Sequence, residues 1–438
     1  MNTLYPGMYR HGRLFDRYPD TPDVSAVLHD DGQHVILELS LLPKIHDKYI
    51  AWFLNVVDSE GNTALSATPM PNRLWFQDEH GNVALMDCHS AGYRWDNGLQ
   101  KGFIQAQRIV FTNVPDVDIH RINGMRTSFG GMGIFFDCKV PDKGVTILGS
   151  QAQKVVHELK LDRSMNSKFR EIRELAVEAD TRSWSVSPFR HFETLLTSKS
   201  TWNRHMLNAA NIQELLMVAS GQNCRLLRQQ IAVRETNGSL SLLQHDDWWD
   251  VYLGKTWQDD VSDRGWFFYS HDLPKDYLKR WKKLRTQYDV GISAFLKLVS
   301  SDIKDVEVQI ALLGIAIEGI GFGIYNRDKV RKDKSNHSRY AKLIVEDLGV
   351  KIPIDLKRWK GSISDVYNAI KHADKERPDD LHLLELRRLS MIIIRIWIAE
   401  KIGVPSPVLL HHLSRSNHLA NYEYVAVPPE PRRRRARP

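Results

Sequence analysis

The sequence predicts an α+β protein, in which a β-rich N-terminal region is followed by an all-helical C-terminal region. Three observations indicate this order. Short β-prone runs separated by turn residues fill about the first 150 residues. Apolar residues recur at helical spacing after Pro274, and the chain ends in a Pro- and Arg-rich segment. We therefore expect a β-rich domain over residues 1–272, a helical domain over 273–405 and a disordered tail over 406–438.

Hairpins are predicted where two β-prone runs flank a turn. The runs 24–29 and 34–41 enclose Asp-Asp-Gly-Gln, a strong hairpin signal. Similar pairs flank turns at 59–62 and 79–82. Further elements are expected before the helical region, namely a helix over 211–220 and strands over 228–235 and 266–269.

The helical region is expected to open with Pro274, which suits the first turn of a helix that continues to about residue 300. A strongly apolar helix follows over 308–326. It is at the short end for a membrane span, so a buried helix is the better interpretation. Its one charged residue, Glu318, requires a partner such as Lys371, His372 or an arginine if it is buried.

Three further helices are predicted toward the C-terminus. The first covers 340–348. Ser362 and Asp365 have the spacing of a capping box and are expected to start the second. Asp379 caps the third, which carries a periodic apolar face and ends at Gly403.

Composition limits the classes of function. The net charge is +7, but the Arg-rich segment 428–438 supplies more than half of it, so any nucleic-acid site must be a local patch. Cys88, Cys138 and Cys224 lie far apart, which argues against a zinc site or a disulfide framework. No apolar run typical of a signal peptide opens the chain. A cytoplasmic protein without metal, cofactor or membrane is expected.

The most informative motif is Tyr-Asn-Ala-Ile-Lys-His-Ala-Asp at 367–374. On a helix, Asn368 and His372 would share one face, with Tyr367 and Lys371 in the neighbouring row. An imidazole beside an amide and an ammonium is suited to proton transfer next to a phosphate. A helix end whose polar residues simply meet water is the plainer interpretation of such spacing.

Two basic stretches are candidates for contact with RNA phosphates. One is the helix face that carries Lys279, Arg280, Lys282 and Lys283. The other is the polar stretch 327–339, which ends at Arg339. A solvated helix face explains such charges equally well.

The helical region resembles the HEPN superfamily. The resemblance is carried by Ile315-Ala316-Ile317-Glu318, then Asn-x-x-Lys-His at 368–372, then a long apolar helix that ends in Ile-Gly. With the segments 24–42 and 271–281, the chain resembles ApeA-type proteins, which carry HEPN domains and act in bacterial anti-phage defence. The two parts of the resemblance cover about residues 10–405.

This resemblance implies a HEPN-type helical bundle with metal-independent endoribonuclease activity, formed across a homodimer. His372 matches the family histidine and Asn368 its polar position. Tyr367 stands where the family carries arginine. Lys371 would replace that positive charge, or the side chain of Arg339 or Arg387 would extend into the site and supply it. The β-rich domain would sense a phage component, and the helical dimer would then cut host or phage RNA, with tRNA as a plausible target, in an abortive-infection response.

The residues suit cleavage by the RNA 2′-OH. His372 would act as acid or base, Lys371 and Asn368 would stabilise the charged phosphorane, and Glu318 would orient Lys371 or His372. Tyr367 would stack on a base or pack in the core. The alternative is a noncatalytic HEPN-like module that binds RNA or protein and dimerises.

Overall fold

The structure, a computed structural model, describes most of the chain in two compact units. The sheet unit comprises Met1–Phe129, Gly149–Ala209 and Leu226–Gln258. The helical unit comprises Gly130–Leu148, Ala210–Arg225 and Asp259–Pro438, so it takes in segments that precede the predicted boundary at 272. The described residues are 3–15, 24–53, 56–57, 63–64, 70–96, 99–112, 119–137, 153–162, 166–177, 184–233, 248–254, 259–328, 336–372, 374 and 378–415.

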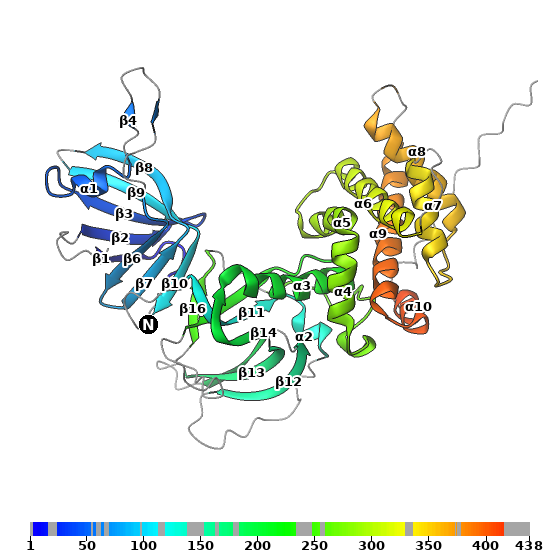
Figure 1. Ribbon diagram of the computed structural model, residues 1–438, viewed down its shortest axis with the longest axis horizontal. Coiled ribbons are helices and arrows are strands. Elements are labelled where there is room, and N and C mark those ends of the chain that lie inside the picture. Colours follow the sequence, from blue (N-terminus) through cyan, green and yellow to red (C-terminus); the bar gives the residue numbers. More distant parts are fainter. Residues whose placement is uncertain are drawn as a thin grey trace, which may run out of the picture. The chain divides into compact units, whose positions relative to one another are not determined.

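The predicted fold class is confirmed, because an antiparallel sheet region precedes an all-helical region (Figure 1). The sheet has 14 strands in the order β12-β13-β14-β11-β15-β16-β10-β7-β6-β1-β2-β3-β9-β8. The strands are β1 (Tyr9–Phe15), β2 (Val24–Asp30), β3 (Val35–Leu41), β6 (Arg73–Asp78), β7 (Gly81–Met86), β8 (His89–Asp96), β9 (Leu99–Ala106), β10 (Arg108–Thr112), β11 (Arg121–Phe129), β12 (Gln153–Asp162), β13 (Ser167–Val177), β14 (Trp184–Thr201), β15 (Leu226–Ala232) and β16 (Trp248–Tyr252).

The predicted hairpins are confirmed. Strands β2 and β3 pair antiparallel and bury alternate residues, as their sequence pattern requires. Asp31 Oδ1 accepts the backbone N–H of His34 at 2.7 Å, and Gly32 supplies the positive φ of the turn. Strands β6 and β7 pair in the same way, and β4 (Val56–Val57) pairs with β5 (Thr63–Ala64).

A buried charge cluster ties β11, β13 and β14 together. Glu193 on β14 accepts from Arg126 Nε of β11 at 2.9 Å and pairs with Arg170 Nη1 of β13 at 3.1 Å. Burial alone would raise the pKa of Glu193, but contacts with His191 and the two arginines outweigh it and lower the pKa to about 2. The carboxylate therefore stays charged inside the sheet and is compensated there.

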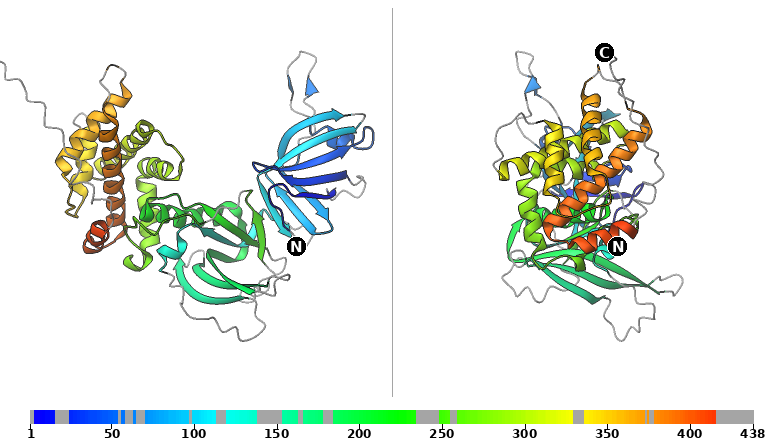
Figure 2. Two further views of the ribbon diagram at one scale, coloured as in Figure 1. Left: turned by 180° about the vertical axis from the view of Figure 1, so that it is seen from behind. Right: turned by 90° about the vertical axis from the view of Figure 1, so that its right-hand side faces the viewer.

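The helical unit contains helices that pack around α9, which Figures 1 and 2 draw in orange. Helix α9 contacts α4, α6, α8 and α10. The helices are α4 (Tyr277–Gln287), α5 (Asp289–Ser300), α6 (Val306–Arg327), α7 (His337–Asp347), α8 (Leu356–Lys371), α9 (Asp380–Ile402) and α10 (Ser406–Arg415), preceded by α2 (Met132–Phe135) and the end of α3 (Trp202–Ser220).

Helix α6 packs closely against its neighbouring helices because it carries four glycines. A Cβ at Gly314 would overlap the Tyr367 ring of α8, and one at Gly321 would overlap Tyr340 of α7. A Cβ at Gly319 would overlap the backbone of Gly291 on α5. The cost of glycine in a helix is thus offset by close helix packing. The fourth glycine, Gly323, receives the ring of Tyr288.

The predicted single helix from Pro274 to about residue 300 is wrong, because it is interrupted at Tyr288, which separates α4 from α5. Tyr288 has φ −120° and ψ 33°, outside the helical range. Its ring is buried edge-on against Trp397 of α9, with 5.0 Å between ring centroids. The helix is therefore interrupted where the Tyr288 ring packs against another helix. The periodicity of apolar residues in the sequence does not indicate such an interruption.

Two other predicted boundaries are also wrong. Helix α8 starts at Leu356 and not near Ser362, because Asp355 is the N-cap and accepts the N–H of Arg358 at 3.0 Å. The aromatic run 266–269 forms no strand. Its members Phe267 and Phe268 are fully buried in the helical unit.

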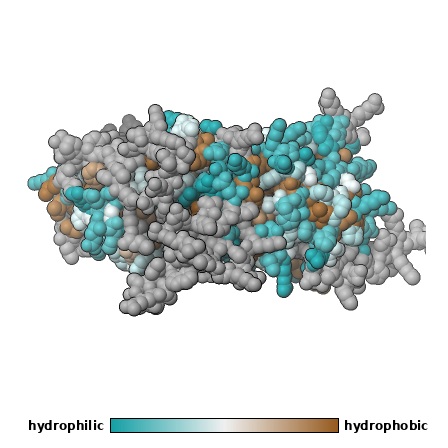
Figure 3. Space-filling view, turned by 90° about the horizontal axis from the view of Figure 1, so that it is seen from below, coloured by the Kyte–Doolittle hydropathy of each residue, from teal (hydrophilic) through white to brown (hydrophobic). Residues whose placement is uncertain are grey.

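The segment from 406 onward was predicted to be disordered, but it begins with the helix α10. Leu409 and Leu413 of this helix are buried. They give it an apolar face at i and i+4, which is sufficient to hold a short helix against its neighbours. The Arg-rich segment 428–438 lies outside the described residues. On the face shown in Figure 3, hydrophobic and hydrophilic residues are interspersed over the coloured surface.

Candidate functional site

Three predicted site residues meet on facing helices. The Tyr367 hydroxyl of α8 donates to Glu318 Oε2 of α6 at 3.2 Å. Lys371 Nζ lies 4.0 Å from Glu318 Oε1 and 4.6 Å from the centre of the Tyr367 ring. The predicted partnership of Glu318 with Lys371 is therefore present. We call Glu318, Tyr367 and Lys371 the polar cluster.

The polar cluster lies at the edge of the bundle and not in its core. The Glu318 side chain is 36% exposed and that of Lys371 is 49% exposed, so Glu318 is not a buried charge, although it has one of the partners that were expected for it. Tyr367, in contrast, is 3% exposed. Its ring fits against α6 because Gly314 has no Cβ.

Tyr367 is held in its protonated form. Burial, followed by the nearby Glu318 carboxylate, raises the pKa of the phenol. The hydroxyl therefore remains a hydrogen-bond donor to Glu318 near neutral pH. Tyr367 packs in the core and also orients the carboxylate, so its aromatic face is not free to stack on a base.

His372 lies just beyond the end of α8. Its φ of −123° and ψ of 114° are extended, so the helix that was expected to carry both Asn368 and His372 ends at Lys371, and His372 is its C-cap. The His372 N–H donates to the Asn368 carbonyl at 3.2 Å, which closes the last turn. His372 is exposed, and among the described residues its ring makes no hydrogen bond or ion pair. Asn368 is half-buried.

His337 is a site residue that the sequence reasoning missed. It is 5% exposed at the start of α7, and its ring lies 4.5 Å from the Tyr367 ring between centroids. Its Nδ1 is 3.0 Å from the Ser364 hydroxyl, which donates to the Lys360 carbonyl. The signal that could have placed it is Asn336, a strong N-cap residue whose side chain accepts the N–H of Arg339.

Acid is expected to destabilise the helical unit through His337. Burial lowers the pKa of His337 to about 4, whereas an unfolded histidine titrates near 6.5. The unfolded chain therefore binds more protons below pH 6.5, and the free energy of unfolding falls as the pH drops toward 4. The loss from this group is at most about 3 kcal/mol. Urea unfolding at pH 7 and pH 4.5, followed by helical circular dichroism, measures it.

A matched pair of variants isolates this contribution. His337→Gln should lose less stability between the two pH values than the wild type does. His411→Gln, at an exposed position on α10, should lose as much as the wild type. Equal losses in the wild type and His337→Gln would show that His337 does not couple protonation to folding.

The basic positions of α4 form a partly neutralised surface. Lys279, Arg280 and Lys283 are exposed, and Lys282 is half-buried. Arg280 Nε pairs with Asp276 Oδ2 at 3.0 Å. Lys279 and Lys283 are therefore the better candidates for attracting phosphate.

The two arginines proposed as substitutes for the family arginine have different surroundings. The Arg339 guanidinium lies 5.9 Å from the centre of the Tyr325 ring. Burial lowers the pKa of Arg387, and its Nε has no hydrogen-bond partner among the described residues. Lys371 is the cation that the structure brings to Glu318.

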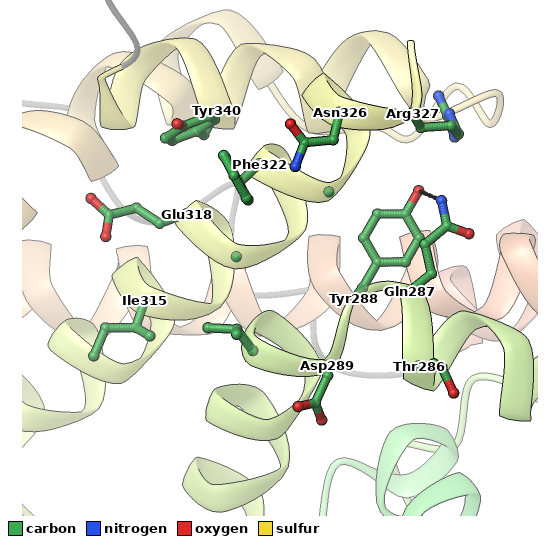
Figure 4. A pocket seen from close by; sticks show the side chains of 13 residues that line it. Thr286, Gln287, Tyr288, Asp289, Ile315, Glu318, Phe322, Asn326, Arg327 and Tyr340 are labelled. Atoms are coloured by element: carbon green, nitrogen blue, oxygen red, sulfur yellow. Dashed lines mark hydrogen bonds between the residues drawn. The ribbon is translucent and has the colours of Figure 1, made fainter. Parts of the chain in front are cut away.

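An open groove adjoins the polar cluster. Its volume is about 790 Å³. Glu318 lines one end of the groove and Arg327 the other, with Phe322, Asn326 and Tyr340 between or above them (Figure 4). The groove is therefore continuous with the polar cluster through Glu318.

Two further findings concern metal and membrane. Within the described parts of the chain, no group of three or more His, Cys, Asp or Glu side chains is placed to hold a metal ion.

Helix α6 is long and apolar enough to cross a membrane, but 50% of its most apolar stretch is buried inside the protein, which is equally typical of a core helix.

Comparisons of the chain with models of protein families, with curated proteins and with solved structures each give no match. The fold and the site define an α+β protein with a polar cluster at the edge of a helical bundle. A functional assignment therefore depends on the chemistry of that cluster and of the residues beside it.

Proposed function

We propose that the protein is a metal-independent endoribonuclease of the HEPN type that acts in anti-phage defence. The observation that carries the proposal is the polar cluster, which lies next to His372 at the end of α8. The cluster pairs a carboxylate with an ammonium, and the exposed imidazole of His372 belongs to the residue that follows Lys371 in the chain. Groups of these kinds suit cleavage of RNA by its own 2′-OH.

In the proposed reaction, the 2′-OH attacks the adjacent phosphorus and the 5′-oxygen of the next nucleotide leaves. His372 takes the proton from the 2′-OH or gives one to the leaving oxygen. Lys371, oriented by Glu318, stabilises the charge on the phosphorane, and the Asn368 amide adds a donor. Tyr367 positions Glu318 through its hydroxyl. The products carry a 2′,3′-cyclic phosphate and a 5′-hydroxyl.

We further propose that two copies of the helical unit assemble into a homodimer, so that two His372 residues act in one cleft. Supporting this, Leu381 and Leu384 at the start of α9 are 74% and 50% exposed. These apolar side chains follow closely after His372 in the chain and suit burial against a second copy. The sheet unit would act as the sensor for a phage component.

The test is to incubate purified protein, in EDTA, with total bacterial RNA and with tRNA. Wild-type protein should produce fragments with cyclic-phosphate ends. His372→Ala should reduce the rate by about 10²- to 10⁴-fold. His411→Ala, a change at an exposed histidine on α10, should leave the rate unchanged. Because purified protein could be at rest, the assay is repeated in lysate from phage-infected cells. Equal rates for wild type and His372→Ala would exclude the proposed mechanism.

A second candidate function is a noncatalytic module that binds RNA. The observation that favours it is the burial of Tyr367, which stands at the family arginine position and serves the packing against His337. In this case Lys279→Glu with Lys283→Glu should abolish RNA binding, whereas His372→Ala should have no effect. Filter binding of radiolabelled tRNA distinguishes the two functions.

A further inference from the structure

The bottom of the groove beside the polar cluster is formed by segments of the chain that pack closely together. A Cβ at Gly319 would overlap the backbone of Gly291, and one at Gly323 would overlap the ring of Tyr288. Helix α5 and Tyr288 therefore lie directly on the backbone of α6 at the bottom of the groove. Tyr288 is 3% exposed, and its hydroxyl accepts from Gln287 Nε2 at 3.2 Å. Such a floor is rigid and does not need to form on binding.

The walls of the groove carry the aromatic ring of Phe322 and the side-chain amide of Asn326. The Phe322 ring is 52% exposed and meets Tyr340 edge-on, with 6.4 Å between centroids. Figure 4 shows Phe322 between Glu318 and Asn326 on α6. Asn326 is exposed, and its side chain has no partner among the described residues. A planar ring with hydrogen-bonding edges matches this combination, because it can stack on Phe322 and pair with the amide.

The groove and the polar cluster share one helix face. Glu318 and Phe322 are one turn apart on α6, a separation of about 6 Å along the axis. This is comparable with the distance from a phosphate through one ribose to its base. A nucleotide whose phosphate lies near Lys371 can therefore place its base over Phe322.

We propose that this groove holds a nucleobase of the RNA strand next to the cleaved phosphate, with Phe322 as stacking platform and Asn326 as reader of the base edge. The inference rests on the proposed function for the identity of the ligand. The centre of an interface between two protein chains is depleted in charged residues. The groove carries Glu318, Asp289 and Arg327 on its walls, which favours a polar ligand over a second copy of the chain.

The test uses a short RNA with 2′-O-methyl riboses and a single 2-aminopurine, so that binding is measured without cleavage. Stacking on Phe322 should quench the fluorescence of 2-aminopurine. Phe322→Leu should remove the quenching and weaken binding by roughly tenfold or more. Asn326→Ala should change the preference among the four bases at that position. Val308→Ala, also exposed on α6 but outside the groove, is the matched control.

The outcomes separate this inference from the proposed function. Quenching that depends on Phe322, with no cleavage of ordinary RNA, would support the groove and contradict the nuclease. Cleavage that depends on His372, with quenching and base preference unchanged in Phe322→Leu and Asn326→Ala, would support the nuclease and overturn the groove. A change from dimer to monomer in Phe322→Leu, measured by light scattering and without loss of quenching, would also overturn the groove, because a second copy would then cover Phe322.

Discussion

Replacing Arg395 by leucine is expected to destabilise the helical unit by about 2–6 kcal/mol, at about 1–3 kcal/mol for each of two buried carbonyls that lose a donor. Arg395 lies in the middle of α9 and is 3% exposed. It donates to the carbonyls of Val218 at 2.7 Å and Gly265 at 2.8 Å, and also to that of Ala219. The substitution would remove this donor from the carbonyls of Val218 and Gly265, whereas the Ala219 carbonyl would keep a hydrogen bond from the backbone N–H of Phe267 at 2.9 Å. Each buried carbonyl that loses its donor is costly.

The guanidinium of Arg395 is also packed against a ring. Its central carbon lies 3.9 Å from the centre of the Phe267 ring. Burial lowers the pKa of this guanidinium, because the charged form is less well solvated inside the protein than in water. Backbone carbonyls and an aromatic face thus compensate the charge where a carboxylate would be usual.

Thermal and urea unfolding of Arg395→Leu measure this prediction. Arg388→Leu is the control, because Arg388 lies two turns earlier on α9, is only half-buried and has no partner among the described residues. It should change stability by less than about 0.5 kcal/mol. A small effect for both substitutions would mean that the carbonyls find other donors, such as water, when Arg395 is removed.

Replacing Gly319 by alanine is expected to destabilise the protein by about 1–3 kcal/mol, although alanine is the better helix former. The added Cβ would overlap the backbone of Gly291, and a backbone cannot rotate away as a side chain can. Helices α5 and α6 would have to separate. The floor of the groove beside Glu318 would then also move.

Gly361→Ala is expected to have the opposite effect on stability. Gly361 lies inside α8, and a Cβ there meets nothing within 4 Å. The substitution should stabilise the protein by up to about 1 kcal/mol, since only the helix preference changes. Urea unfolding of both variants tests the pair. Stabilisation by Gly319→Ala would show that α5 and α6 are not in close contact in solution.

Local signals in the sequence predicted the elements that depend on local chemistry. The turn at Asp31 and Gly32 defined the first hairpin, and Asp379 and Gly403 marked the two ends of α9. In each case the backbone conformation or the cap is made by the residues at the position itself. Such features need no knowledge of distant parts of the chain.

The missed features depend on tertiary packing. Tyr288 breaks a helix where its ring is buried against Trp397. His337 enters the site because α7 packs beside Tyr367, about 30 residues further along the chain. Of the predicted site, the pairing of Glu318 with Lys371 is found, whereas the helix expected to carry both Asn368 and His372 ends one residue before His372. Helical spacing predicts a face only as far as the helix continues.

The glycines of α6 have a consequence for which amino-acid changes the chain can accept together. Gly314, Gly319, Gly321 and Gly323 each meet a different residue of a neighbouring segment. At Gly314 and Gly323 the neighbour is a tyrosine ring, so a larger residue there could be matched by a smaller side chain at Tyr367 or Tyr288. At Gly319 the neighbour is the backbone of another glycine, so no substitution can make room and this position should stay glycine. Libraries that vary α6 together with its partners should yield folded variants far more often than libraries that vary α6 alone.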